Sequence, residues 1–466
     1  MTAGALPVAD PRAPAYPRVA ARARATGRPW VRPVHLVVLT LYASVLGQLG
    51  RVPILWAQGK DAPLLLHELP LVAALAAAAV ACARARSLRL DGVCAAALAF
   101  ALVGLVSAVF AVDTFRLSGY EFAVSTAYLA RWLAYLGIYV VVLNTARVED
   151  ARALWVAVER GVLAFTAFGI AQSALLPGFA QKVFPEGGES MPWDWQGHRL
   201  VSTILDPNYA GGLILLPLLV VLARLASGDR VPLWKPLVLL AGLLLTFSRS
   251  SALGLVVGGL VIVAARGFRG PLVRFAAVAL VAALPAVPVL ARLGAEYNKF
   301  TVRDGSAMQR TVMWLRALTV LGDHPVLGVG FNTYGFVQRR YGWDVVGRDG
   351  FAVDGGLLFV AVMTGLVGLA AYLAMFGLAW RRARRLWRDP GASPLARGTA
   401  LGVFAASLAI VVHSCFVNSL LLPFIMAPMW ALWGVVFLLA RARAAEAGAA
   451  PRAVARAGAE RGLRAA

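Results

Sequence analysis

Arginine and aspartate side chains in four short polar segments are the residues of this sequence best suited to chemistry. Three segments carry Arg199, Arg249 and Arg310. A guanidinium group binds phosphate oxygens through two parallel hydrogen bonds and stays charged at physiological pH. The fourth segment carries Asp354 just before an apolar run. This pattern predicts a site that binds a phosphate-containing substrate and offers one carboxylate as a base.

The first segment ends in Asp206-Pro207-Asn208, directly before an apolar run. Proline suits the first turn of a helix, and an aspartate before it is a favourable N-cap. Capping therefore explains these three residues but not Arg199, which lies earlier in the segment. We assign Arg199 to catalysis and Asn208 to substrate binding.

The second segment, Ser248-Arg249-Ser250-Ser251, is a turn between two apolar runs. An arginine at a membrane surface can serve as an ordinary anchor. The adjacent hydroxyl groups, however, suit an oxyanion, and ionisable groups in membrane segments are functional candidates. Ser248 and Arg249 are therefore predicted to bind substrate.

The third segment places apolar residues at helical spacing between Met308 and Leu321, which predicts an amphipathic helix on the membrane surface. This helix carries Arg310, a catalytic candidate, and Arg316, a binding candidate. In the fourth segment, Asp354 is either a general base or merely the N-cap of the helix that follows.

Membrane-spanning helices must position these segments. The chain of 466 residues is 60% hydrophobic and only 15% charged, with a mean hydropathy of +0.73, whereas soluble domains are about 45–50% apolar and about 25% charged. Apolar runs of about 17–25 residues match the hydrocarbon core, where only helices satisfy the backbone at such lengths. We predict an all-α polytopic membrane protein with about twelve spans. The expected spans are Val34–Gly50, Leu64–Ala81, Gly92–Val112, Phe122–Leu143, Leu154–Leu176, Tyr209–Ala223, Leu233–Phe247, Ser251–Ala265, Leu272–Leu290, Leu357–Trp380, Leu401–Val417 and Leu420–Ala440.

Arginine-rich connections set the expected orientation. With the N-terminus in the cytoplasm, every even-numbered connection and the C-terminal tail are basic and cytoplasmic, as the positive-inside rule requires. All four polar segments then lie on the periplasmic side of a bacterial inner membrane. The two short spans around Ser248 can also form a re-entrant pair. We divide the chain into a disordered basic N-terminus (1–33), a membrane domain (34–440) containing a periplasmic loop with the amphipathic helix (291–353), and a cytoplasmic tail (441–466).

The net charge of +22 reflects these basic connections and does not indicate nucleic-acid binding. No histidine, cysteine or acidic residues have metal-ligand spacing, so no metal and no cofactor are expected.

The order of the motifs resembles the O-antigen ligase and polymerase family of bacterial polysaccharide enzymes. The resemblance rests on Arg199 with the turn from Ser202 to Asn208, on Ser248-Arg249 followed by Gly254, on Arg310 with Trp314, and on Pro325 with Gly328 and Gly330. It implies transfer of an undecaprenyl-pyrophosphate-linked glycan to a sugar hydroxyl outside the membrane, without metal or nucleotide sugar. The implied partners are this donor, a glycan or lipid A-core acceptor, the lipid bilayer and a chain-length regulator. Arg131, within a predicted span, is a secondary phosphate contact.

One departure from the family favours a polymerase. Ligases of this family usually carry His-Asn after the large loop, whereas this chain has Asp354-Gly355. Polymerase-type relatives often resemble Asp-Asn there. A ligase remains the main alternative, a protein oligosaccharyltransferase is another relative, and a lipid-oligosaccharide flippase or other transporter is the rival from a different class.

Overall fold

A computed structural model of the protein describes residues 32–57, 60–183, 197–267, 270–283, 305–343 and 353–465. These residues are almost entirely helical, apart from one two-stranded hairpin. Ten of the described helices are long and apolar enough to cross a membrane. The predicted all-α polytopic fold is therefore confirmed. Nearly all of the predicted disordered terminus, 1–33, lies outside the described residues.

The elements follow the predicted runs in order. The first part of the chain forms α1 (Pro33–Ala43), a 3-10 helix (Ser44–Gly50), β1 (Arg51–Ala57), β2 (Lys60–Leu65), α2 (Glu68–Ala85), α3 (Gly92–Phe115), α4 (Gly119–Thr145), α5 (Asp150–Leu175) and α6 (Phe179–Val183). The second part forms α7 (Pro207–Ala226), α8 (Trp234–Leu245), α9 (Arg249–Arg266), α10 (Gly270–Ala283), α12 (Gly305–Asp323), α13 (Tyr334–Val337), α14 (Gly356–Arg388), α15 (Pro394–His413) and α16 (Pro423–Ala465). The 3-10 turns are Ser202–Ile204, Gln338–Tyr341 and Ser419–Leu421.

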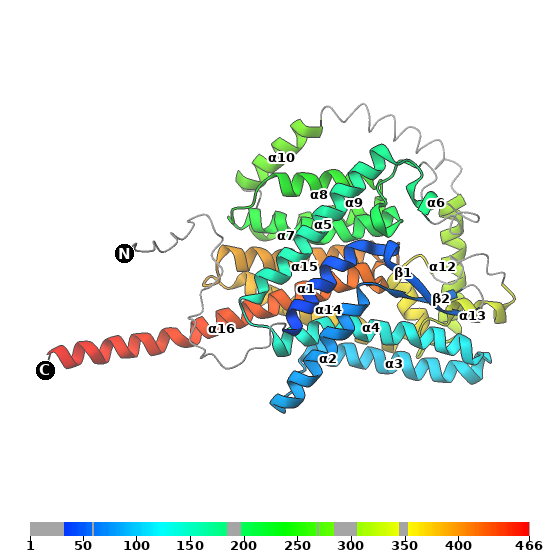
Figure 1. The fold of residues 1–466 in the computed structure, drawn as a ribbon, viewed down its shortest axis with the longest axis horizontal. Helices are drawn as coiled ribbons and strands as arrows, with labels where there is room; N and C mark the ends of the chain where they lie inside the picture. Colours follow the sequence, from blue (N-terminus) through cyan, green and yellow to red (C-terminus); the bar gives the residue numbers. More distant parts are fainter. Residues whose placement is uncertain are drawn as a thin grey trace, which may run out of the picture.

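The helices form a bundle with two distinct ends (Figure 1). One end carries the β1–β2 hairpin, α6, α12 and α13, and we call it the loop end. At the opposite, basic end lie the connections 86–91, 146–149, 227–233 and 389–393. α12 crosses the loop end transversely to most of the long helices, as an interfacial helix would (Figure 1). It contains the helix expected at 308–321.

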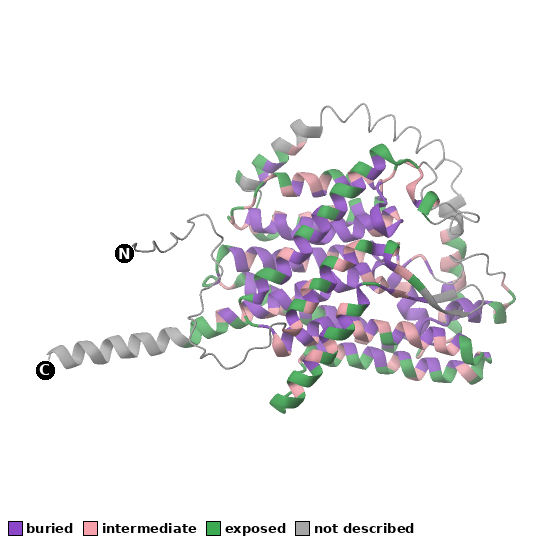
Figure 2. Ribbon diagram, in the orientation of Figure 1, coloured by how far each residue is buried: buried purple, intermediate pink, exposed green. Residues whose placement is uncertain are grey.

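Aromatic side chains join the middle of the bundle. Phe100 of α3 lies edge-on to Trp132 of α4, with ring centroids 4.9 Å apart, and to Tyr372 of α14 at 4.8 Å. Trp132 in turn meets Trp430 of α16. All four side chains are fully buried, so α3 and α4 share one core with α14 and α16, which lie far later in the sequence. Figure 2 shows this buried interior, and α7 is buried along most of its length.

One of the expected spans is shorter than predicted. α8 has 12 residues and rises only about 18 Å, which is less than the hydrocarbon core of roughly 30 Å. The run expected to end at Leu290 is described only as far as Ala283. The β1–β2 hairpin, which was not predicted, pairs its strands antiparallel and lies between α1 and α2.

α14 is interrupted near Gly365, where the backbone adopts φ +65° and ψ −174°. Such a break frees backbone groups that lipid cannot satisfy. The segment 325–330 satisfies them: the N–H groups of Val329 and Gly330 donate to the carbonyl oxygens of Val362 and Met363, at 2.9 and 3.0 Å.

Bonds in the opposite direction complete the pairing. The Leu366 N–H donates to the carbonyl oxygen of Pro325 at 2.8 Å, and the Val367 N–H donates to that of Val326 at 3.4 Å. The hydroxyl of Ser107 on α3 also donates to the Met363 carbonyl oxygen at 3.1 Å. The Pro-x-x-Gly-x-Gly segment is therefore a structural partner of the broken helix.

Replacing Gly365 with Ala should strongly destabilise the protein. A Cβ atom there would overlap the backbone of Val326 and Leu327, and a left-handed non-glycine residue alone costs about 1–2 kcal/mol. We expect the Gly365→Ala protein to unfold at clearly lower temperature in detergent. The control is Gly377→Ala in the same helix, where an added Cβ meets nothing within 4 Å. Equal unfolding temperatures for the two variants would contradict this account.

Candidate functional site

Arg310 and Asp354 form an ion pair at the loop end. Arg310 Nε donates to Asp354 Oδ2 at 2.9 Å, with the two side chains 31% and 44% exposed. Trp314, one turn further along α12, donates its indole N–H to the Asp354 carbonyl oxygen. Residues four apart share one helix face, so α12 holds both the backbone and the side chain of Asp354 from one side.

Asp354 is not a helix cap. The N-cap position of α14 is Gly355, and no side chain caps this helix. Gly355 adopts φ +140°, and a Cβ atom there would lie 3.1 Å from the carbonyl oxygen of Cys415. The structure thus contradicts the capping alternative, and the half-exposed carboxylate of Asp354 points to Arg310 instead.

Asp206 caps α7, as its sequence context predicted. Its Oδ1 accepts the backbone N–H groups of Asn208 and Tyr209 at 2.7 and 2.9 Å. Burial raises the pKa of Asp206 from 3.8 to about 6, although these hydrogen bonds and the positive charge of Arg199 act to lower it. The nearby charge of Asp354 also contributes to the raised pKa. Arg199 and Asp354 therefore both lie within electrostatic reach of Asp206.

The beginnings of α7 and α9 lie against each other. A Cβ atom on Gly211 of α7 would approach Ser251 Cβ to 2.9 Å. Ser248 caps α9, because its hydroxyl oxygen accepts the Ser251 backbone N–H at 3.3 Å and the Ser251 hydroxyl at 2.9 Å. Helix N-termini carry partial positive charge and favour anions.

Two predicted arginines flank these helix starts. Arg199 Nε donates to the carbonyl oxygen of Thr246 at 2.9 Å, which ties it to the turn before α9. Arg249 is exposed in the first turn of α9. Its guanidinium has no ion-pair partner within the part of the chain that the structure describes. The loop end thus presents Arg199, Arg249 and Asp206 at the starts of α7 and α9, and the Arg310–Asp354 pair at the start of α14.

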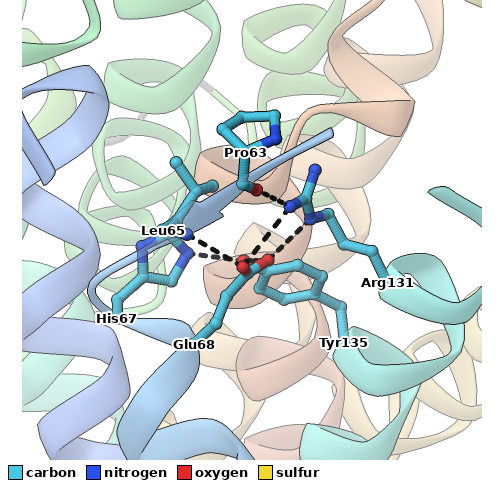
Figure 3. A network of polar contacts seen from close by, with 6 residues as sticks. All are labelled: Pro63, Leu65, His67, Glu68, Arg131 and Tyr135. Atoms are coloured by element: carbon cyan, nitrogen blue, oxygen red, sulfur yellow. Dashed lines mark hydrogen bonds and ion pairs between the residues drawn. The ribbon is translucent and has the colours of Figure 1, made fainter. Parts of the chain in front are cut away.

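Arg131 has a different environment from the one expected. Its Nε donates to Glu68 Oε1 at 2.7 Å, and its guanidinium also bonds the carbonyl oxygen of Pro63 in β2 (Figure 3). Glu68 further accepts the Leu65 N–H and the Tyr135 hydroxyl. Arg131 therefore already has a carboxylate partner in a network that fixes the hairpin to α2 and α4.

Arg316 also lies apart from the Arg310–Asp354 pair. Its guanidinium lies over the ring of Trp343, 5.2 Å from the centroid. Residues six apart in a helix lie on different sides of it, so Arg310 and Arg316 do not point towards the same place. Among predicted binding residues, Asn208 lies in the first turn of α7 and Ser248 is buried as a cap.

Sequence reasoning gave no role to Glu68. The available signal was an acidic residue at the start of an apolar run, because a charged group in such a place usually has a partner. The partner, Arg131, lies 63 residues away, and no local pattern indicates it.

A comparison with family models bears on the family resemblance. Residues 237–373 match the family model described as O-antigen ligase. The matched region runs from α8 to α14 and includes Arg249, Arg310 and Asp354, whereas Arg199 lies outside it. The resemblance recognised from the motifs is confirmed. No curated protein matches the chain.

The raised pKa of Asp206 predicts a specific pH dependence of stability. The native state holds this proton more tightly than the unfolded chain, so ionisation of Asp206 weakens the fold as the pH rises from about 4 to above 6. A rise of the Asp206 pKa from 3.8 to about 6 corresponds to roughly 3 kcal/mol of stability. Thermal unfolding in detergent at pH 5 and pH 7.5 should therefore show a smaller pH-dependent loss for Asp206→Asn, which keeps the cap. The exposed Asp113→Asn is the control, and identical pH profiles for wild type and Asp206→Asn would refute the assignment.

Proposed function

We propose that this protein transfers a glycan from a polyprenyl-pyrophosphate carrier to the hydroxyl group of an acceptor sugar, on the periplasmic face of the inner membrane. The family match supports a membrane glycosyltransferase of the O-antigen ligase and polymerase family. The donor, the face of the membrane and the roles of individual residues are our proposal.

The observation that carries the proposal is the Arg310–Asp354 pair at the entrance of α14. A buried structural ion pair would exclude solvent, but this one is partly exposed at the end of the bundle. It places a carboxylate and a phosphate-binding group 2.9 Å apart. Glycosyl transfer from a pyrophosphate donor needs both groups, one for the incoming hydroxyl and one for the departing phosphate.

The chemical step uses these groups in turn. The acceptor hydroxyl attacks the anomeric carbon of the donor, and its proton passes to the Asp354 carboxylate. The bond between this carbon and the pyrophosphate oxygen breaks, and the pyrophosphate leaves with the electron pair. Arg310 gives up its hydrogen bond to Asp354 and binds the phosphate instead, which frees the carboxylate to accept the proton. Arg199 and Arg249 stabilise the remaining charge.

A polymerase fits the site better than a ligase. Asp354-Gly355 stands where ligases of this family usually have His-Asn, so the acceptor faces a carboxylate. A ligase that uses lipid A-core as its acceptor is the alternative. The two differ in their products, because a polymerase lengthens the glycan on its carrier whereas a ligase removes the finished glycan from it.

The broken helix α14 raises the possibility of a transporter, since transporters bind substrates at interrupted helices. In this chain the backbone groups at the break are already bonded to the segment 325–330. These backbone groups are therefore not available to bind a substrate. This arrangement favours an enzyme over a transporter.

The proposed orientation predicts accessibility from the periplasm. In a chain with its natural cysteines replaced by serine, a cysteine at the exposed Thr319 of α12 should react with a membrane-impermeant thiol reagent in intact spheroplasts. A cysteine at the exposed Arg230, at the basic end, should react only after lysis. The reverse pattern would place the candidate site in the cytoplasm and exclude the proposed reaction there.

Asp354→Asn should slow glycan transfer about a hundred- to ten-thousand-fold, as expected for loss of a general base. The amide can still accept a hydrogen bond from Arg310, so the pair's geometry changes little. Turnover is measured with purified protein and a lipid-linked glycan donor. The control is Asp323→Asn, because Asp323 is an exposed carboxylate at the same end that bonds Tyr341. A loss below tenfold would reduce Asp354 to a residue that positions Arg310.

Arg310→Ala should lose glycan transfer, whereas Arg310→Lys should keep part of this activity. Lysine keeps the positive charge but cannot form two parallel hydrogen bonds to a phosphate group. Loss of one charge-assisted contact corresponds to about 1.5–3 kcal/mol, and we expect the same order for Arg199→Ala and Arg249→Ala. Wild-type polymer in cells that carry any of the three alanine variants would contradict the arginine assignment.

A further inference from the structure

A groove lies between α2 and α4, towards the basic end of the bundle. It encloses about 590 Å³ and is lined mainly by apolar side chains. Apart from Leu75, the side chains from α2 are mostly small, among them Ala78, Ala79 and Cys82, and those from α4 include Val140 and Val141. None of these residues takes part in the candidate site.

The groove results from the way the two helices cross. Leu75 of α2 packs directly on Gly137 of α4, where a Cβ atom would lie 3.3 Å from Leu75 Cγ. Beyond this contact α2 leaves the bundle and its end projects outward (Figure 1). Because the following residues of α2 are small, the diverging helices leave a space between them.

The groove opens sideways, at the depth of the membrane. Ala79 and Ala83 line it and are exposed, and the neighbouring Val72 and Val80 of α2 are also exposed. α2 qualifies as a membrane span, so its exposed apolar residues face lipid. A molecule that enters this groove therefore comes from the bilayer.

The polar end of the groove carries an arginine. Arg86 and Ser87 line it where α2 ends, and Asn144 of α4 lies opposite. Asn144 accepts the Arg89 backbone N–H at 2.7 Å and donates to the Arg89 carbonyl oxygen at 3.1 Å. This reciprocal bonding fixes the turn after α2 beside the groove.

The guanidinium groups here are available to a ligand. Arg84, Arg86 and Arg89 are exposed, and within the described ranges their side chains have no acidic partner. Arg86 lines the end of the apolar groove, and Arg84 and Arg89 lie within three residues of it along the chain. This concentration of positive charge complements one ligand type, a lipid with an anionic headgroup.

We propose that this groove is a binding site for an anionic bilayer phospholipid, with an acyl chain between α2 and α4 and the phosphate at the arginine turn. This site goes beyond the proposed function and does not depend on it. The glycan donor is not the expected occupant, because the arginine turn and Asp354 lie at opposite ends of the bundle. The lipid would fill a space that α2 otherwise leaves open beside α4.

The test uses the purified full chain and phosphatidylglycerol that carries a photoreactive acyl chain. We expect crosslinks to peptides of α2 and α4, and a clear preference over phosphatidylcholine with the same acyl chains. Each basic residue near an anionic lipid contributes about fivefold in binding, from roughly 1 kcal/mol per charge. The combined variant Arg84→Gln, Arg86→Gln and Arg89→Gln should therefore reduce labelling at least tenfold.

The matched control removes three other exposed arginines of the basic end, Arg230, Arg384 and Arg388, and should keep the labelling. Ala79→Phe fills the groove without changing charge and should also abolish labelling of α2 and α4. Equal labelling by both phospholipids, or equal loss in the two triple variants, would overturn the proposal. Undiminished labelling of Ala79→Phe would equally refute the groove as the location of the acyl chain.

Discussion

Four backbone hydrogen bonds between the interruption of α14 and the segment 325–330 determine how the loop end is built. A helix cannot lose backbone bonds in lipid unless another part of the protein replaces them. Here Gly365 opens the helix, and the residues from Pro325 to Gly330 supply donors and acceptors on both sides of the opening. The close approach requires residues without side chains, since a Cβ atom on Gly328 would lie 2.7 Å from Gly365 N.

This pairing also sets the distance between the two proposed catalytic groups. α12 ends at Asp323, two residues before the paired segment begins. Asp354 lies eleven residues before Gly365, at the start of the same interrupted helix. The pairing therefore fixes the C-terminal end of α12 against α14. Arg310 and Trp314, closer to the N-terminus of α12, then contact Asp354. The proposed site at the loop end is in this way anchored to the helix bundle.

Hydropathy was sufficient to predict most helices, because a span is a local property of the sequence. The run Gly92–Val112 lies within α3, and Phe122–Leu143 lies within α4. The break at Gly365 was not predicted, because a glycine in an apolar run is common and its partner lies about forty residues earlier in the chain. The β1–β2 hairpin, in a short connection between spans, was missed as well.

The residue types of the candidate site were chosen from the sequence, but the contacts between them were not predicted. Arginines and one aspartate were grouped because they suit a phosphate donor, but the pairing of Arg310 with Asp354 spans 44 residues. Arg131 was assigned to phosphate binding because nothing in the sequence indicates its ion pair with Glu68. The capping alternative for Asp354 was excluded only by the position of Gly355 at the start of α14, and the role of Asp354 as a base stays a prediction.

The most direct test of the proposed reaction compares what is released with what is formed. Purified protein in lipid receives a polyprenyl-pyrophosphate-linked oligosaccharide labelled in both the lipid and the sugar. The account predicts one molecule of free polyprenyl pyrophosphate for each new glycosidic bond. Glycosidic bonds formed without release of polyprenyl pyrophosphate, or movement of the intact donor across the bilayer with no bond formed, would contradict it.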